Sequence, residues 1–359
     1  MKKWIRNTII IVILVLLILG AYAVYFYSAY DRIADRVHSE TKTSGSYSYF
    51  ADDEAINAGR AYNIMTYNIS YGFHTSEYSS YDYGGKYTRA DSEEAVMANL
   101  CDIADVINKS APDFILLQGV DMNSTRSYHV NELELINEFL KGYYYSYAQS
   151  EKSPFLAYPL YSPKGQTDTA LATYSVGIIS ENVRRSLPIT DTIAKYFEPD
   201  RCYMVTRIPL ANEKNLCIYN VQLSKEDEEV KEKQLEMLFN DMAFEYKMGN
   251  YIVCGGDFGM NLRKDAAEDV QDPSWAMPFP RTMLPEGFKM GIDCTNEYSV
   301  RHDSCRDAMG EYVPQETFTA TTDGFIVSDN ILVNYYNNAN WQYKYSNHDP
   351  VLMQIYIKG

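Results

Sequence analysis

The sequence has few basic residues and no cluster of them beyond its N-terminus. It contains 32 Lys and Arg against 48 Asp and Glu, for a formal net charge of −16 at pH 7. Lys2, Lys3 and Arg6 precede the first apolar run, so the rest of the chain is still more acidic. Binding to a phosphate backbone normally draws on clustered cations, and an acidic surface repels that backbone. We therefore expect no nucleic-acid partner.

The six cysteines show no paired spacing of the kind that binds zinc. Cys294 and Cys305 flank a polar loop and could form a disulfide outside the cell, so both the bridged and the free alternative stay open for this pair. The other four stand singly in apolar segments and are predicted to be buried thiols: Cys101, Cys202, Cys217 and Cys254.

No internal repeat and no Pro-rich or Gly/Ser-rich linker divides the long C-terminal part of the chain. Residues 31–60 are rich in Ser, Thr, Asp and Glu without periodicity, which is typical of a juxtamembrane stalk. The remaining length of about 300 residues suits one large α/β domain or two domains equally well. Because no linker is present, we predict a single domain at residues 61–359.

Residues 1–30 form a separate unit that begins with cations. An apolar run extends from Ile9 to Leu19 and continues to Phe26, and a helix of about 20 such residues spans a bilayer core. The positive-inside rule then predicts a cytoplasmic N-terminus, a single span at residues 8–27 of the cell membrane, and an extracytoplasmic domain. Ala21-Tyr22-Ala23 resembles a signal-peptide cleavage site, which leaves cleavage as the alternative. Since the apolar character continues beyond this tripeptide, we expect an uncleaved anchor.

Apolar periodicity predicts the elements of the domain. A helix with apolar residues from Val96 to Ile107 follows a capping-box pattern at Asp91 and Glu94. Two more helices are predicted at Val130–Leu140 and Val230–Lys247. Strands are predicted at Tyr62–Tyr67, Asp113–Gln118, Tyr143–Gln149, Thr169–Ile179, Cys202–Leu210, Leu216–Leu223, Tyr251–Cys254, Gly324–Ser328, Asn330–Val333 and Val351–Ile357. Many strands and a few long helices in mixed order predict an α+β sandwich with helices outside packed sheets.

Five short polar motifs lie at the ends of predicted strands, and their order is informative. They are Asn68, Gln118-Gly119-Val120-Asp121, Asn220-Val221-Gln222-Leu223, Gly256-Asp257-Phe258-Gly259 and Ser346-Asn347-His348-Asp349-Pro350. Together they resemble the endonuclease/exonuclease/phosphatase superfamily, whose motifs are Asn, Gln-Glu, Asn-x-His-Leu, Gly-Asp-x-Asn and Ser-Asp-His-x-Pro. The resemblance covers residues 62–357. It implies a four-layered α/β sandwich of two packed mixed or antiparallel sheets flanked by helices, with one metal-dependent phosphoesterase site at the strand ends.

The same resemblance identifies the catalytic positions that the chain keeps and those that it has lost. Asn68, Asp257 and His348 are retained. The family's metal-binding Glu, phosphate-contacting His, orienting Asn and the Asp before the last His are replaced by Gly119, Gln222, Gly259 and Asn347. In the family, the closing Asp–His pair is expected to orient the general base. The lost side chains are those that would position the reacting phosphate and stabilise its charge, and these two effects provide most of phosphoryl-transfer catalysis.

Other side chains could substitute for the missing groups. Asp121 lies two residues beyond Gly119 and shares its face if the strand continues, and Asp168 and Asp323 are further candidate carboxylates. An active site would need Mg²⁺ or Mn²⁺, with Asp121 and Asp257 as its ligands. In the polar segment after Asp121, Arg126 and His129 are candidate contacts for an anionic or sugar ligand, the alternative being a solvated loop.

Three classes of function follow. The first is a pseudoenzyme that keeps its pocket for an anionic, sugar or phosphorylated ligand or for a protein partner. The second is an active phosphodiesterase or phosphatase with a rearranged metal site, and the third is a structural or adhesive surface module. If substitution alone disabled the site, restoring Glu, His, Asn and Asp at the four lost positions would recover metal-dependent hydrolysis.

Overall fold

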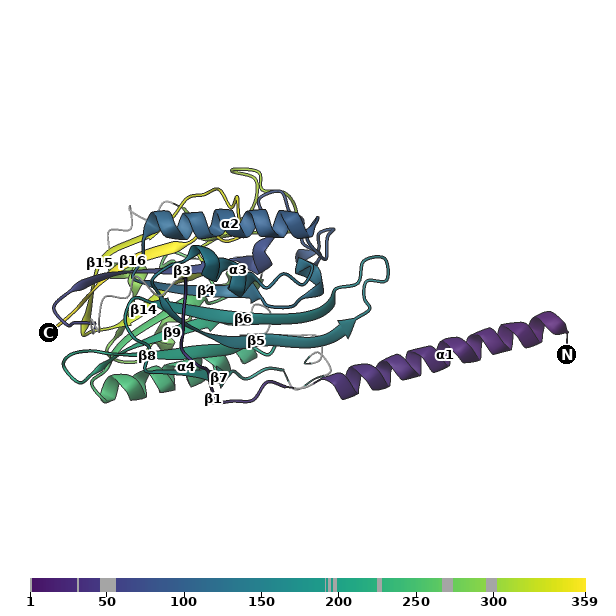
Figure 1. Ribbon diagram of the computed structural model, residues 1–359, viewed down its shortest axis with the longest axis horizontal. Helices are drawn as coiled ribbons and strands as arrows, with labels where there is room; N and C mark the ends of the chain where they lie inside the picture. Colours follow the sequence, from purple (N-terminus) through teal and green to yellow (C-terminus); the bar gives the residue numbers. More distant parts are fainter. Residues whose placement is uncertain are drawn as a thin grey trace.

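The computed structural model describes residues 2–30, 32–45, 56–190, 199–224, 228–266, 274–294 and 302–359, together with Thr192 and Lys195. Residues 31 and 46–55 of the predicted stalk lie outside these ranges. Figure 1 shows the helix α1 (Lys3–Ala29) projecting from a domain in which strands occupy the centre and helices the outside. The C-terminus lies at the end of the domain that is remote from α1.

Two mixed sheets, each of seven strands within the described residues, form the centre of the domain. The first has the order β1 (Val37–His38), β7 (Glu181–Ser186), β8 (Cys202–Pro209), β9 (Asn215–Gln222), β10 (Tyr251–Asp257), β14 (Asp323–Ser328) and β11 (Phe288–Met290). The second has the order β15 (Ile331–Asn338), β16 (Val351–Ile357), β3 (Ala61–Asn68), β4 (Phe114–Asp121), β6 (Gly165–Ser175), β5 (Tyr144–Leu156) and β2 (Lys42–Thr43). A short ribbon pairs β12 (Cys305–Arg306) with β13 (Thr319–Ala320).

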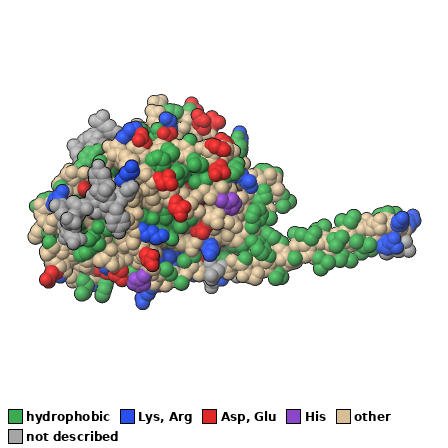
Figure 2. Space-filling view, viewed as in Figure 1, with side chains coloured by type: hydrophobic (Ala, Val, Ile, Leu, Met, Phe, Trp, Pro, Cys, Tyr) green, Lys and Arg blue, Asp and Glu red, His purple; other side chains and the backbone are tan. Residues whose placement is uncertain are grey.

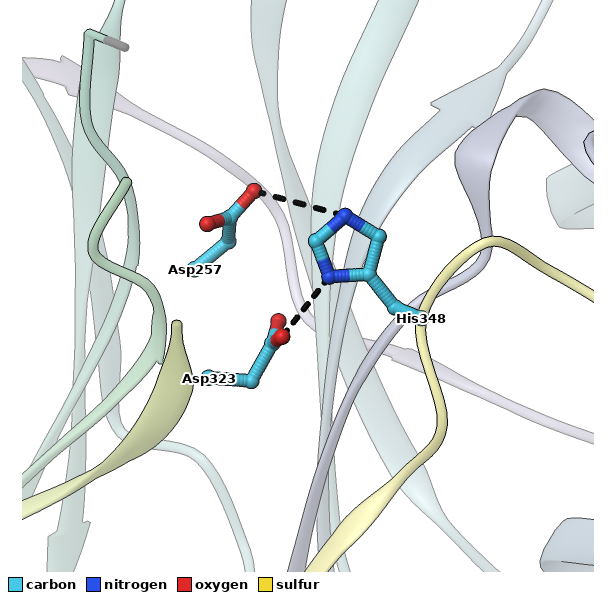
Figure 3. Close-up of side chains that lie close together, drawn as sticks. All are labelled: Asp257, Asp323 and His348. Atoms are coloured by element: carbon cyan, nitrogen blue, oxygen red, sulfur yellow. Dashed lines mark hydrogen bonds and ion pairs between the residues drawn. The ribbon is translucent and has the colours of Figure 1, made fainter. Parts of the chain in front are cut away.

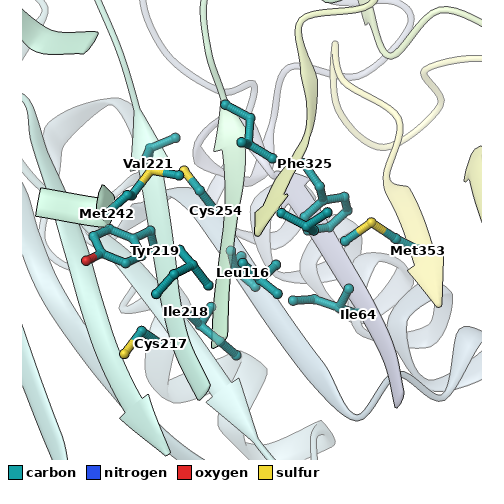
Figure 4. Packing of buried hydrophobic residues seen from close by; sticks show 14 of the residues in the cluster. Ile64, Leu116, Cys217, Ile218, Tyr219, Val221, Met242, Cys254, Phe325 and Met353 are labelled. Atoms are coloured by element: carbon teal, nitrogen blue, oxygen red, sulfur yellow. The ribbon is translucent and has the colours of Figure 1, made fainter. Parts of the chain in front are cut away.

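Alternation along the central strands decides which residues enter the space between the sheets. Ile64 of β3 and Leu116 of β4 face Phe325 and Cys254 of the opposite sheet in one buried cluster (Figure 4). Their chain neighbours Met65 and Ile115 belong instead to a second cluster on the outer face. This is the period of two that a strand imposes, and both faces are apolar because both are covered.

In the described part of the chain, three helices cover the outer faces of the sheets. The helices α2 (Glu93–Ser110) and α3 (Glu132–Phe139) pack on the second sheet, and α4 (Glu228–Lys247) packs on the first. The four-layered α+β sandwich predicted from the sequence is therefore confirmed. One local detail was predicted incorrectly: Ser92, not Asp91, caps α2, because its side chain accepts the Ala95 N–H.

The pairing of the strands brings the polar motifs to one edge of the sandwich. In the parallel pair β3–β4, Asn68 lies opposite Gln118. In the parallel pair β9–β10, Asp257 lies opposite Gln222, and the antiparallel strand β14 places Asp323 on the other side of Asp257. Parallel strands end at the same edge, so residues distant in the chain converge there.

The segment between α1 and the domain is in contact with the domain. Strand β1 pairs with β7 of the first sheet, and β2 pairs with β5 of the second. Ile33 N–H also donates to the Asp200 carboxylate. Within residues 32–45, the predicted stalk is thus part of the folded structure. Helix α1 has 27 residues and is the one described helix that is long and apolar enough to cross a membrane.

Candidate functional site

Asn68, Asp257 and His348, the three retained motif residues, converge at the edge of the sandwich. Asn68 Nδ2 donates to Asp257 Oδ2 at 2.9 Å and lies 3.4 Å from His348 Nε2. The orientation of this amide is set by a backbone donor, because Ser70 N–H donates to Asn68 Oδ1. Asp257 Oδ2 and His348 Nε2 are 3.9 Å apart, with the Asn68 amide bridging them.

Asp323 holds the other side of the His348 ring. Its Oδ2 is 2.7 Å from His348 Nδ1 (Figure 3). The Ser304 hydroxyl donates to the same oxygen. Burial raises the pKa of Asp323, and the facing His348 opposes that rise. The carboxylate favours the tautomer in which Nδ1 carries the proton and Nε2 faces the Asn68 amide.

A cavity of about 770 Å³ opens beside this group. Asn68, Gln222, Asn347 and His348 line it. Aromatic and basic side chains also line it, including Tyr71, His74, Trp275, Arg126, Lys152, Lys164 and Arg201, together with the acids Asp82, Glu151, Asp200 and Asp307. Burial raises the pKa of Tyr71 to about 12, so its hydroxyl remains a donor at neutral pH.

Solved structures share this architecture at low sequence identity. An endonuclease/exonuclease/phosphatase protein from Beutenbergia cavernae is 15% identical, with a TM-score of 0.59 over 84% of this chain and 72% of its own. One from Bacteroides vulgatus is 12% identical, with a TM-score of 0.54 over 83% of this chain and 100% of its own. A mannosyl-6-phosphatase from Bacteroides thetaiotaomicron is 12% identical, with a TM-score of 0.51 over 82% of this chain and 99% of its own.

The chain has the endonuclease/exonuclease/phosphatase fold. The sequence matches no protein-family model and no curated protein. At such identities the likeness establishes the fold, and the site has to be interpreted from its own residues.

Gly119, at the position of the family's metal-binding Glu, has a backbone that disfavours a side chain. It has φ +63° and lies in an irregularity of the β4–β6 pairing between Leu117 and Val120. A Cβ built there would lie 2.8 Å from Asn68 Oδ1 and 3.2 Å from Ser70 N. At this position the chain therefore differs from the family motif in its backbone geometry as well as in the missing carboxylate.

The other three replaced positions line the cavity or contact Asp257. Gln222 is buried and lines the cavity. Gly259 has φ +60°, and its N–H donates to Asp257 Oδ1 at 3.0 Å. Asn347 is 1% exposed, and neither its side-chain oxygen nor its nitrogen has a hydrogen-bond partner among the described residues. A buried amide without a partner is costly, so Asn347 is a candidate contact for a ligand.

The role that the sequence motif suggested for position 347 was wrong. The motif places the Asp that orients the histidine directly before it, where this chain has Asn347. In the structure that function belongs to Asp323, at the start of β14, which hydrogen-bonds the ring. The replacement at position 347 therefore leaves the histidine–carboxylate pair intact.

Asp121 lies in a separate buried network. Arg126 donates to both of its oxygens, at 2.9 and 2.8 Å, and the hydroxyls of Ser127 and Thr169 donate to it as well. The guanidinium carbon of Arg126 lies 3.4 Å from the centre of the Tyr71 ring. A carboxylate with these donors is already compensated, so the structure offers no reason for Asp121 to bind a metal.

Asp168 and His129 lie away from the cavity lining. Asp168 accepts a hydrogen bond from Gln149 Nε2 at 2.6 Å, and burial raises the pKa of its carboxyl. His129 Nδ1 lies 2.7 Å from Asn123 Oδ1 on an exposed segment. Of the candidate ligand contacts, Arg126 lines the cavity and His129 does not.

Among the described residues, one group of side chains could hold a metal ion: Asp257, Asp323 and His348. The group fits Mg²⁺ poorly, since that ion requires octahedral oxygen coordination. Asp323 Oδ2 is engaged by His348 Nδ1 and Ser304, and the Asn68 N–H points at Asp257 Oδ2. Neither Gly119 nor Asn347 supplies the missing carboxylate.

Cys305 is a neighbour of the site that the motifs did not indicate. Its Sγ lies 3.5 Å from His348 Nε2. Cys294 and Cys305 are both free, so the possible disulfide between them is absent. Cys202, Cys217 and Cys254 are buried as predicted, whereas Cys101 is exposed. The sequence carries no signal for Cys305, because its β-bridge with His348, 43 positions away, exists only in the folded chain.

Proposed function

We propose that this chain is a membrane-anchored, extracytoplasmic binding protein, a pseudoenzyme whose disabled phosphoesterase site binds a phosphorylated ligand. The observation that carries this proposal is the positive φ of Gly119, with the Asn68 amide at the place where a side chain would extend. The principal carboxylate of a Mg²⁺ site is missing, and the surrounding groups hydrogen-bond to one another. Phosphoryl transfer relies on electrostatic stabilisation by such ions, so its loss is severe.

The cavity retains groups that suit a phosphate. Asn347 can donate through its unpaired amide, and His348 and the Tyr71 hydroxyl add further polar contacts. Lys152 and Arg201 also line the cavity, and no carboxylate within the described ranges forms an ion pair with either of them. These groups provide positive charge and hydrogen-bond donors, which is what a phosphate monoester needs.

The binding part of the proposal is tested by calorimetric titration of the full-length protein with glycerol phosphate. We expect binding by wild type and about tenfold weaker binding by Asn347→Asp, because the new charge repels the ligand. Asn334→Asp adds the same charge at an exposed residue of β15 outside the cavity and serves as the matched control. Equal affinities for all three proteins would contradict phosphate binding at Asn347.

The pseudoenzyme part is tested by hydrolysis of a simple phosphodiester with Mg²⁺ or Mn²⁺ and a chelator control. We expect no chelator-sensitive turnover by wild type. Asp257→Asn should therefore leave the rate unchanged, and added Mg²⁺ should leave the melting temperature unchanged, since only an ion that binds the native state stabilises it.

The intact Asp323–His348 pair favours a second candidate, an active hydrolase with a rearranged site. A positioned histidine with a carboxylate partner can act as a general base. Robust turnover by wild type that is lost in both Asp257→Asn and His348→Gln would establish this candidate and overturn the first.

Anchoring is supported by the length and composition of α1 and by the cations before it. The exposed thiol of Cys101 offers a test of sidedness. In a Cys294→Ser background, a membrane-impermeant maleimide should label intact cells, and Cys101→Ser should abolish the labelling. Labelling that requires lysis would place the domain in the cytoplasm.

A further inference from the structure

The turn between β5 and β6 exposes a group of large apolar side chains. Phe155, Tyr158, Leu160 and Tyr161 are 41%, 60%, 87% and 75% exposed. We call residues 154–164 the hairpin tip. Single exposed apolar residues are ordinary, but four within seven positions form a patch of the kind that contacts a protein or a membrane.

Polar contacts attach the hairpin tip to the rest of the domain. The Thr88 hydroxyl lies 2.7 Å from Ser162 Oγ, and Arg89 donates to the Pro163 carbonyl at 2.9 Å. Lys164 forms an ion pair with Asp82. These contacts fix the backbone of the tip to the domain while the apolar side chains face outward.

Helix α1 contacts this same tip. The Ala157 N–H donates to the Tyr22 hydroxyl at 2.9 Å, and the Tyr22 hydroxyl donates to the Phe155 carbonyl at 3.1 Å. The Phe155 N–H donates to the Tyr25 hydroxyl at 3.2 Å. The tip therefore lies alongside the last two turns of α1.

These contacts determine the depth of the tip relative to a bilayer. A span at residues 8–27 measures about 30 Å, the thickness of a hydrocarbon core. Tyr22 then lies about 8 Å inside the outer end of the span. Tyr25 lies about 3 Å inside that end. Tyrosines are enriched at the membrane–water interface, so the contact of Tyr25 with the tip belongs to that boundary. Side chains attached beside Tyr22 and Tyr25 are at the same level.

The cavity opens at the same place. Phe26 and Tyr30 from the end of α1, and Pro154 and Leu156 from the hairpin tip, line it together with His348. Figure 2 shows apolar side chains along α1 and on the adjoining side of the domain. The route into the site thus borders the surface from which the anchor emerges.

We propose that the hairpin tip enters the bilayer interface beside α1 and that the cavity receives the phosphorylated headgroup of a phospholipid from that leaflet. This inference rests on the anchoring and phosphate binding proposed above. Lys152 lies just before the tip and lines the cavity, where it can neutralise the phosphate as it enters. The acidic remainder of the domain makes nonspecific attraction to an anionic membrane unfavourable.

Membrane depth is tested with the full-length protein in phosphatidylcholine nanodiscs that carry bromine near the glycerol end of the acyl chains. We expect Leu160→Trp to add fluorescence that the brominated lipid quenches. Phe244→Trp is the matched control, because Phe244 is 62% exposed and lies on α4, which leads into the start of β10. Asp257 of the site is at the other end of β10. Equal quenching of the two added tryptophans would overturn the inference.

Ligand class is tested by thermal unfolding in discs of phosphatidylcholine alone or mixed with phosphatidic acid. We expect phosphatidic acid to raise the melting temperature of wild type, and Asn347→Asp to lose that rise. Leu160→Asp should also lose the rise caused by phosphatidic acid, but this variant should still be stabilised by soluble glycerol phosphate. Stabilisation of wild type by glycerol phosphate but not by phosphatidic acid would overturn the lipid inference and leave the proposed function standing. If neither glycerol phosphate nor phosphatidic acid stabilises wild type, both the lipid inference and the proposed phosphate binding are overturned.

Discussion

Asp323 and His348 form a buried hydrogen-bonded pair, with Asp323 Oδ2 2.7 Å from His348 Nδ1 and each residue 1% exposed. The pair joins the start of β14 to the segment before β16, so it connects the two sheets. A hydrogen bond to a charged partner contributes about 1.5–3 kcal/mol in the protein interior. The pair is therefore a structural link between the sheets whether or not the site turns over.

We predict a coupling energy of about 1–3 kcal/mol between Asp323→Asn and His348→Gln in a double-mutant cycle. The measurement is the free energy of unfolding from urea titrations. The exposed pair Glu229–Lys233 on α4 is the control and should couple by less than about 0.5 kcal/mol. A coupling as small as that of the control would mean that the hydrogen bond contributes nothing.

Gly119→Ala should destabilise the fold by about 2 kcal/mol, because a left-handed backbone alone costs an L-residue 1–2 kcal/mol. The close approach of the new Cβ to Asn68 Oδ1 adds to this cost. Gly310→Ala is the control, since no atom lies within 4 Å of a Cβ there. A near-neutral Gly119→Ala would show that β4 can relax at this position. For the same reason, restoring Glu at position 119 should fail to recover hydrolysis, contrary to the expectation from the motifs alone.

Arg126→Met should cost about 3–5 kcal/mol, because it leaves the fully buried Asp121 carboxylate without its cation. Arg263→Met removes an arginine from its surface pair with Asp265 and should change stability by less than about 1 kcal/mol. The combination Arg126→Met with Asp121→Leu tests the cause. It should recover part of the loss, and a purely additive result would contradict the explanation by an unpaired charge.

Glu132 should make the fold more stable in acid than at neutral pH. Burial raises the pKa of its carboxyl well above the ordinary value, and the neighbouring Asp121 raises it further. A group with a raised pKa binds its proton more tightly when folded. Its contribution is complete below the unfolded pKa of about 4.3 and is lost as pH rises through the folded pKa. Glu132→Gln should therefore be more stable than wild type at neutral pH.

The check is the free energy of unfolding measured from mildly acidic to neutral pH. The difference between Glu132→Gln and wild type should grow with pH. Glu138→Gln, on the exposed side of α3, should run parallel to wild type. Parallel curves for Glu132→Gln as well would contradict the raised pKa.

The sequence predicts the architecture because buried strands and amphipathic helices leave clear apolar patterns. It also predicts that Asn68 and Asp257 converge, since both follow strands that end at one edge. The partner of His348 was assigned wrongly because Asn347 is adjacent in the chain, whereas Asp323, 25 positions away, comes next to the ring only in the folded structure. The backbone of Gly119 was equally inaccessible, because a glycine in a sequence does not reveal the sign of its φ.

Polar composition misled the prediction for residues 32–45. Two short edge strands need only backbone groups to pair, so β1 and β2 leave no apolar period in the sequence. The hairpin tip was missed for the opposite reason. Its apolar residues suggest a buried segment, and only the fold shows that they face outward.

The short connection between α1 and β1 restricts where the domain can act. Seven residues separate Ala29 from Val37, and they span at most about 25 Å when extended. This length is close to the radius of gyration of about 19 Å expected for a domain of this size. Strand β1 then fixes the chain to the first sheet, so little slack remains. With α1 in the membrane as proposed above, a domain on so short a tether operates in cis, on molecules of the leaflet next to it, and a facing membrane across a wider gap lies beyond its reach.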